Sequence, residues 1–154
     1  MPRLSSPSTA GHEDLSEDLQ EQVSAFVRAF GLHRPDLTPC GEPVTVSQAH
    51  ALAELAVKGS CPQSELALAL RLSKSTVSRL VDQLQESGWV ERKRNASGDK
   101  RTVELRLTSN GRRVATRIGS ARHDRMARLL ARIPETERAV VLRSLSVLVE
   151  AARD

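Results

Sequence analysis

The spacing of the apolar residues changes abruptly at Gly88, and this change restricts the possible folds more than any other feature of the chain. Before Gly88 the apolar residues recur at helical spacing, namely Val77, Leu80, Val81 and Leu84. After Gly88 the apolar residues alternate with polar ones, namely Val103, Leu105 and Leu107. The sequence therefore predicts a helix over residues 73–87, followed directly by a hairpin with strands near 90–94 and 102–107.

A shorter helix is predicted just before this one, over residues 63–70. Pro62 precedes it, and proline is tolerated in the first turn of a helix because that turn has no partner for its amide groups. Arg71 and Leu72 leave room only for a tight turn, and Ser73 is a preferred N-cap residue. Two helices joined in this way form a helix-turn-helix, whose second helix enters the major groove of DNA.

The start of the second helix and the hairpin carry groups suited to DNA. The first turns of the helix hold small polar or basic residues: Lys74, Ser75, Thr76, Ser78 and Arg79. The hairpin adds long basic side chains for phosphates or the narrow minor groove: Arg92, Lys93, Arg94, Lys100 and Arg101. Lys and Arg together number 23 against 19 for Asp and Glu, and the excess lies after residue 70. Double-stranded DNA is the predicted partner.

The remaining segments predict further helices and few strands. Residues 1–12 are rich in Ser and Pro and are expected to be a disordered tail, followed by an amphipathic helix over 13–30. The connection over 31–44 contains three prolines, and Thr45 with Gln48 matches a capping box that begins a helix ending near Lys58. Thr108 is expected to cap a long helix, and Pro134 separates it from a last helix near 135–152. The fold class is therefore α+β, mostly α.

Residues 63–111 resemble the MarR family of winged helix-turn-helix transcriptional regulators. The resemblance lies in Leu66, Ala67 and Leu70, then in Leu72, Ser73, Thr76, Val77 and Ser78, and then in Leu84, Gly88 and Val90. It continues through the wing residues Asp99, Lys100 and Arg101 and ends with Leu107, Thr108, Ser109, Asn110 and Gly111. An Asp-x-Arg wing followed by Leu-Thr-x-x-Gly is far more specific than a helix-turn-helix alone.

The resemblance implies a homodimer, and it assigns a role to each segment of the chain. Residues 13–154 would form a single domain of the MarR type, with 45–111 as the winged-helix DNA-binding lobe and with 13–30 and 112–154 as N- and C-terminal dimerisation helices. In this family Arg101 would reach the minor groove and Asp99 would orient it. The expected function is that of a ligand- or oxidant-responsive repressor, which binds a pseudo-palindromic operator as a dimer.

An effector site and a redox site are weaker expectations. His33, Arg34 and His50 lie around the cleft in which the family binds small anionic effectors, which suggests a phenolic or carboxylate ligand. Cys61 is placed at the N-cap of the short helix, where the helix dipole would lower the thiol pKa, and Cys40 is the second redox candidate. Most arginines after residue 111 are expected to form a solvated face or to pair with acids of the first helix.

Other function classes fit the sequence less well. A winged-helix module that binds a protein or RNA would present apolar anchors at 73–78 instead of hydroxyl groups. The His and Cys residues lack metal-ligand spacing, so neither a metal nor a cofactor is predicted, and equilibrium dialysis would dismiss a metal sensor. No phosphate-binding glycine loop or activated nucleophile indicates an enzyme. Because no apolar run is long enough to span a membrane, the expected location is the cytoplasm.

Overall fold

The computed structural model describes residues 10–34, 38, 41–94 and 103–153 of the chain. Within these residues the helices are α1 (Ala10–Phe30), α2 (Val46–Lys58), α3 (Gln63–Leu70), α4 (Lys74–Glu86), α5 (Ser109–Ala131) and α6 (Glu135–Ala151). The strands are β1 (Ser60–Pro62), β2 (Val90–Arg94) and β3 (Val103–Leu107). The predicted α+β, mostly helical winged-helix fold is confirmed.

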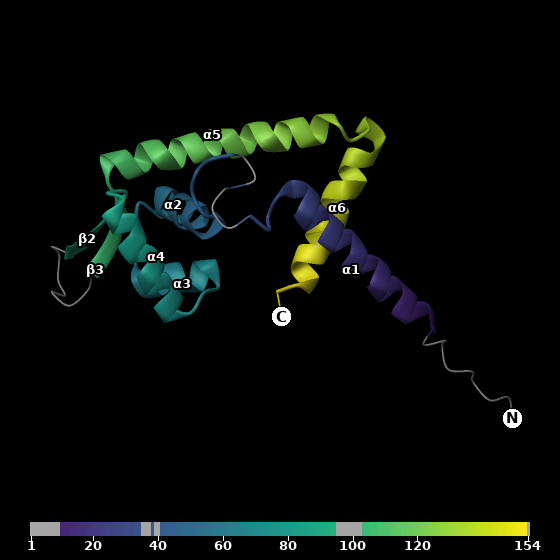
Figure 1. Cartoon of the computed structure of the whole chain (residues 1–154), viewed down its shortest axis with the longest axis horizontal. Coiled ribbons are helices and arrows are strands. Elements are labelled where there is room, and N and C mark those ends of the chain that lie inside the picture. The colour runs from purple at the N-terminus through teal and green to yellow at the C-terminus, as the bar shows by residue number, and fades with distance from the viewer. Residues whose placement is uncertain (1–9, 35–37, 39–40, 95–102, 154) are drawn as a thin grey trace, which may run out of the picture.

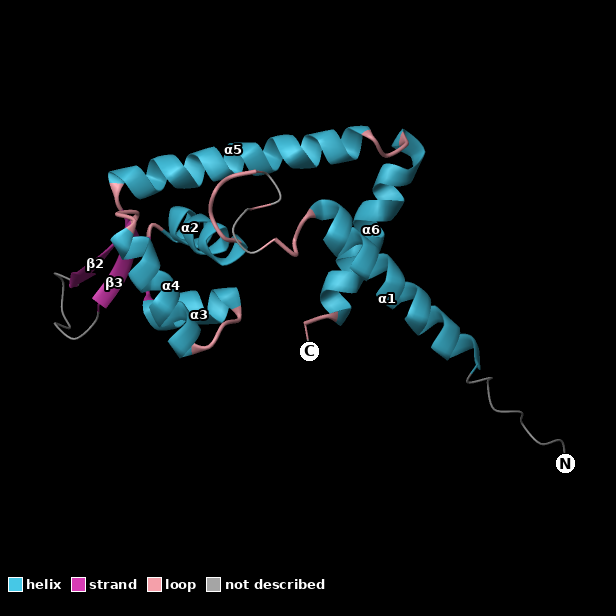
Figure 2. Cartoon of the chain, in the orientation of Figure 1, coloured by secondary structure: helices cyan, strands magenta, loops and turns pink. Residues whose placement is uncertain are grey.

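The long helix α5 connects two parts of the molecule (Figure 1). At its N-terminal end lie α2, α3, α4 and the strands, which we call the lobe; at its other end lie α1 and α6, which we call the arm (Figure 2). The C-terminal end of α6 lies toward the lobe, whereas the start of α1 lies far from it (Figure 1). None of the helices in the described residues is long and apolar enough to cross a membrane.

Helix starts are fixed by side-chain caps at the predicted residues. The Thr45 hydroxyl accepts from the Gln48 amide at 3.1 Å, and the Gln48 side chain accepts from the Thr45 amide at 3.0 Å. This closes the predicted capping box of α2 and satisfies two amide groups that the helix leaves without a partner. Ser73 caps α4 and Thr108 caps α5 in the same way, each accepting from the amide three residues on.

The sheet contains a strand that the sequence did not indicate. β1 pairs antiparallel with β3, with Cys61 opposite Leu105, so the order of the strands is β1-β3-β2. Cys61 therefore lies in a strand, and Pro62 is the N-cap of α3. The predicted N-cap position of Cys61 is wrong, because three residues after Gly59 extend along β3 before α3 begins.

One core holds the lobe together and fixes the position of α4. The apolar side of α4 is buried against α2, α3 and the sheet, and its buried residues are Val77, Leu80, Val81 and Leu84. Leu52, Leu55 and Leu66 from α2 and α3 and Leu105 from β3 complete this core and are almost fully shielded from water. Each buried leucine contributes about 2 kcal/mol through the hydrophobic effect, so the opposite side of α4 is presented on a rigid support.

The arm is amphipathic but has no core of its own. The helix α1 begins at Ala10, so residues 10–12 are helical and do not belong to the predicted disordered tail, whose other residues, 1–9, lie outside the described residues. No side chain from residue 14 to 30 is buried, and none on α6 is buried either. The apolar residues Leu15, Leu19, Val23 and Phe26 on α1 remain exposed, as do Val140, Leu142, Leu145, Val147, Leu148 and Val149 on α6.

Candidate nucleic-acid interface

The turn between α3 and α4 sets the direction in which α4 leaves. Arg71 ends α3 in the left-handed conformation, with φ 53° and ψ 41°, and is the only non-glycine of the described residues with positive φ. Its amide donates to the carbonyls of Ala67 and Leu68, so the strained backbone is held by hydrogen bonds. The Arg71 guanidinium also donates to the carbonyl of Arg153 at 2.8 Å, which ties this turn to the C-terminal end of the arm.

The exposed face of α4 consists of the polar and basic residues that the sequence singled out. Lys74, Ser75, Thr76 and Arg79 are exposed, and Ser78 is half-buried. The Ser73 hydroxyl is hydrogen-bonded to those of Ser75 and Thr76, at 3.0 and 2.8 Å. Because the apolar side of the same helix is fully packed, the structure presents a preorganised row of donors and acceptors without an apolar anchor.

The wing is only partly described. Arg94 ends β2, whereas the predicted contacts at Asp99, Lys100 and Arg101 lie outside the described residues. Lys93 is exposed and pairs with Glu91 at 3.2 Å.

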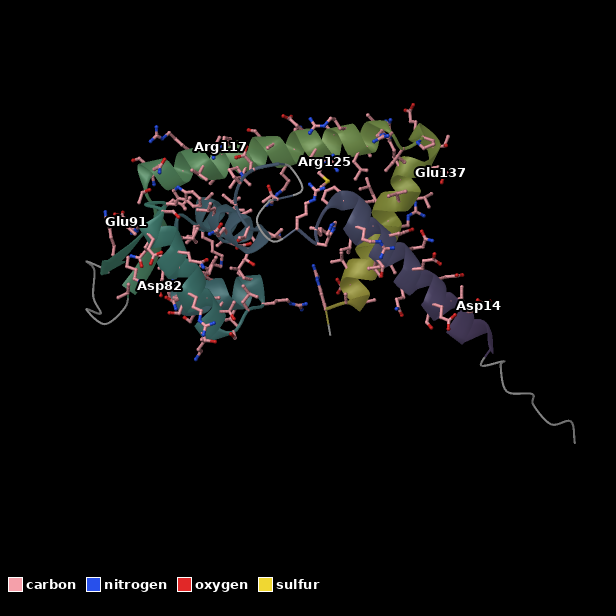
Figure 3. The ribbon with its side chains drawn as sticks, viewed as in Figure 1. Asp14, Asp82, Glu91, Arg117, Arg125 and Glu137 are labelled. Atoms are coloured by element: carbon pink, nitrogen blue, oxygen red, sulfur yellow. The ribbon has the colours of Figure 1, made fainter. Side chains whose placement is uncertain are left out.

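Arg92 links strand β2 to helices α3 and α4, although we expected it to contact DNA. Its guanidinium donates to the Asp82 carboxylate at 2.9 Å and to the Gln63 side chain at 3.3 Å, and it also reaches Gln85. These partners lie on α3 and α4, so one side chain connects β2 to both helices of the helix-turn-helix. Figure 3 labels Asp82 on α4, near Glu91 on β2.

We therefore expect Arg92→Ala to act on stability and not on contacts with phosphate. The free energy of unfolding should fall by about 1 kcal/mol, since the bonds are charge-assisted but the pair is partly exposed. The slope of log affinity against log salt concentration in DNA binding should stay unchanged, as measured by fluorescence anisotropy. A slope that is smaller by about one unit would identify Arg92 as a phosphate contact and contradict this role.

The junction between the wing and α5 explains the Leu-Thr-x-x-Gly motif. The Thr108 hydroxyl donates to the Gly88 carbonyl at 2.7 Å and accepts from the Gly111 amide at 2.9 Å. The Thr108 amide donates to the carbonyl of Trp89 at 3.0 Å. A Cβ on Gly111 would lie 1.9 Å from that same carbonyl oxygen, so only glycine allows α5 to pack this close to the strand.

A pocket of about 210 Å³ lies where the arm meets the lobe. Its apolar lining includes Phe30, Leu32, Val46 and Met126, and its polar lining includes His50 and Arg122. Partial desolvation of the imidazole lowers the pKa of His50, Arg122 lowers this pKa too, and Glu54 raises it by less. His50 thus lies at a pocket, as expected, while Phe30, Arg122 and Met126 were not found as pocket residues because their contacts join helices distant in sequence.

The two other predicted effector residues lie differently. Arg34 lines a second pocket of about 220 Å³, together with Arg28 and Arg125. His33 is exposed and lines neither pocket. Arg125 extends from α5 toward the end of α1, and its guanidinium lies 5.4 Å from the centre of the Phe30 ring (Figure 3). The arginines of α5 are thus not one solvated face, since Arg117 pairs with Glu42 and Arg125 with an aromatic ring.

The structure gives the redox expectation no support at Cys61. This residue is buried, with 2% of its surface exposed. Burial raises the pKa of the Cys61 thiol, and the neighbouring Glu65 raises it further, so the reactive thiolate is disfavoured. Cys40 lies outside the described residues. Among the residues whose placement is described, no group of His, Cys, Asp and Glu is arranged to hold a metal ion.

Comparison with known proteins identifies relatives of this chain. The sequence model of the MarR family matches residues 44–103. The transcriptional repressor MprA of Escherichia coli K12 is 32% identical over 79 residues, which are 51% of this chain and 44% of MprA. The transcriptional repressor MdtR of Bacillus subtilis is 28% identical over 142 residues, or 91% of this chain and 89% of MdtR. The chain thus matches under half the length of MprA but nearly all of MdtR.

A solved structure shares the fold of this chain. The crystal structure of a mutant MarR from Escherichia coli, complexed with operator DNA, superposes with a TM-score of 0.68. The match covers 85% of this chain and 93% of that one, at 23% identity. This likeness shows the fold.

Proposed function

We propose that the chain is a regulator of the MarR family, whose sequence model matches residues 44–103, and that it represses transcription by binding a pseudo-palindromic operator as a homodimer. The main observation that supports the proposal is that α4 is amphipathic. Its apolar side is buried, and its other side presents Lys74, Ser75, Thr76 and Arg79 to solvent. Such a helix suits direct readout in a major groove, where guanidinium and hydroxyl groups contact base edges.

The exposed apolar residues of the arm support the homodimer. Helices in proteins gain most of their stability from packing of an amphipathic face, and no side chain of α1 from residue 14 to 30 is buried in the single chain. The apolar side of α1 and the apolar residues of α6 together form a surface that a second copy would cover. Pairing through α1 and α6 would leave both lobes free, so that two α4 helices face one DNA duplex.

The pocket between the arm and the lobe supports regulation by a ligand. Its walls come from α1, α2 and α5 and from Thr38, so a bound molecule would touch both parts at once. A ligand that binds better to one spacing of the lobes shifts the population toward that spacing. We propose that a small phenolic or carboxylate effector releases the operator in this way. The buried state of Cys61 favours ligand over oxidant as the signal.

The contribution of α4 is tested with Arg79→Ala on a duplex that the wild-type chain selects from a random-sequence pool. Loss of a bidentate contact to a base should weaken binding by about 1–3 kcal/mol and relax the sequence preference at one position per half-site. Arg128→Ala is the matched control, since this exposed arginine lies at the arm end of α5. Equal losses for both variants, measured by anisotropy, would show a general charge effect and refute readout by α4.

The pH dependence of effector binding follows from His50. The lowered pKa means that the imidazole is neutral at pH 7 in the free protein, and a bound carboxylate would favour its protonated form. Binding therefore takes up a proton, and the affinity for benzoate should rise as the pH falls from about 8 to about 5.5. Calorimetry on wild type and His50→Gln checks this. A variant with the same pH profile as wild type would exclude His50 as the titrating group.

A further inference from the structure

The two pockets at the junction of arm and lobe share a wall. Phe30, Thr38 and Arg125 line both of them. Each pocket alone, at about 210 and 220 Å³, is smaller than the roughly 300–1,000 Å³ typical of ligand sites, whereas the two together reach that range. The shared residues make them neighbouring halves of one region.

The two halves differ in chemistry. The first half has an apolar lining, with His50 and Arg122 as polar groups. The second half is lined by Arg28 from α1, Arg34 from the turn after α1 and Arg125 from α5. In the part of the chain that the structure describes, no carboxylate pairs with any of these three arginines. Four other arginines of the described residues do pair with a carboxylate: Arg92, Arg106, Arg117 and Arg153.

Three guanidinium groups line one small pocket, and no carboxylate among the described residues pairs with them, so they are available to bind an anion. The three arginines come from α1, from the turn after α1 and from α5, so the pocket exists only where these segments meet. Guanidinium groups also offer paired donors that match the two oxygens of a carboxylate or the oxygens of a phosphate. The Phe30 ring holds the Arg125 guanidinium between the halves through a cation–π contact, at 5.4 Å from the ring centre.

We propose that the effector of this protein is a dianion, with an apolar body in the first half and a second acidic group in the pocket formed by Arg28, Arg34 and Arg125. The inference rests on the proposed effector function and adds the class of ligand to it. The first acid contacts His50 and Arg122, and the body contacts Phe30, Leu32 and Met126. A ligand with two acidic groups would also join α1 to α5, the two helices that lead from the arm to the lobe.

The test compares ligands that differ only in the second acid. Calorimetry measures the affinity for 3-phenylpropanoate and for 3-(4-carboxyphenyl)propanoate, and for the pair biphenyl-4-carboxylate and biphenyl-4,4′-dicarboxylate, on the full-length chain. In at least one pair the dianion should bind about 10-fold tighter or better, as expected for one charge-assisted contact. Arg28→Gln and Arg34→Gln should each reduce this advantage and leave the affinity for the monoanion unchanged.

Arg128→Gln is the control, because it removes a positive charge from α5 without lining either pocket. It should keep the full advantage of the dianion. Equal binding of monoanion and dianion in both pairs would refute the second acid subsite while leaving the effector pocket in place. An advantage that survives in Arg28→Gln and Arg34→Gln would refute the assigned arginines. Absence of binding by all four ligands would refute the effector function itself. DNA binding is measured in a separate experiment, so this outcome would leave the proposed operator binding unaffected.

Discussion

Gly111→Ala should unfold the protein at much milder conditions than wild type. The new methyl group would lie 1.9 Å from the Trp89 carbonyl oxygen and 2.8 Å from its carbon, and these are backbone atoms that no rotamer change can move. The same carbonyl accepts from the Thr108 amide, so separating the two segments also breaks the start of α5. We expect a loss of about 3 kcal/mol or more, at the upper end of the effects of overpacking.

The matched control is Gly119→Ala, eight residues further along the same helix. A Cβ at Gly119 would meet no atom within 4 Å, and alanine favours the helix by up to about 1 kcal/mol over glycine. Thermal and urea unfolding followed by circular dichroism gives both values. If Gly111→Ala unfolded at the midpoint of wild type or of Gly119→Ala, the close packing of α5 on the strand would be disproved.

Replacing Leu19 and Leu145 together by Glu should abolish the dimer and with it tight operator binding. These side chains are 50% and 46% exposed in the single chain, one on each arm helix. Two carboxylates in the apolar contact would be costly to bury, so the chain should be monomeric and lose helix content from α1. Operator affinity should fall by about 100-fold or more, because a monomer loses the gain from binding two half-sites at once.

Analytical ultracentrifugation and anisotropy measure these two effects on the same samples. Val57→Glu is the control for oligomeric state, since Val57 is 88% exposed on α2, a helix of the lobe. It should remain a dimer. A dimeric Leu19→Glu, Leu145→Glu double variant would place the interface elsewhere and would leave the exposed apolar faces of α1 and α6 without an explanation.

The parts of the fold that follow from local rules could be predicted from the sequence. Capping residues such as Thr45, Ser73 and Thr108 bind amide groups three residues away, so their role is visible within a few positions of the chain. The same holds for the buried side of α4, which depends on helical spacing alone. Once the buried side of α4 is known, the residues on its opposite, exposed side are known as well.

The parts that depend on distant contacts could not be predicted. The strand β1 has only three residues and exists because β3, more than forty positions later, pairs with it. We predicted Arg92 to contact DNA because its hydrogen-bond partners, Gln63 and Asp82, lie on other elements and are not evident from the sequence around it. From the sequence alone, Arg125 belongs to a charged face of a helix. Its pocket position depends on Phe30 of α1, which the fold places next to its guanidinium group.

The most direct test of the central claim is the DNA sequence that the wild-type chain selects from a random duplex pool. Two α4 helices related by a two-fold axis predict an inverted repeat, with half-site centres about 10 base pairs apart or a multiple of that spacing. The enriched duplex should bind a dimer, with an affinity that falls steeply as the salt concentration rises. Selection of a single unrepeated motif, or of no motif, would contradict the account of a dimeric operator-binding repressor.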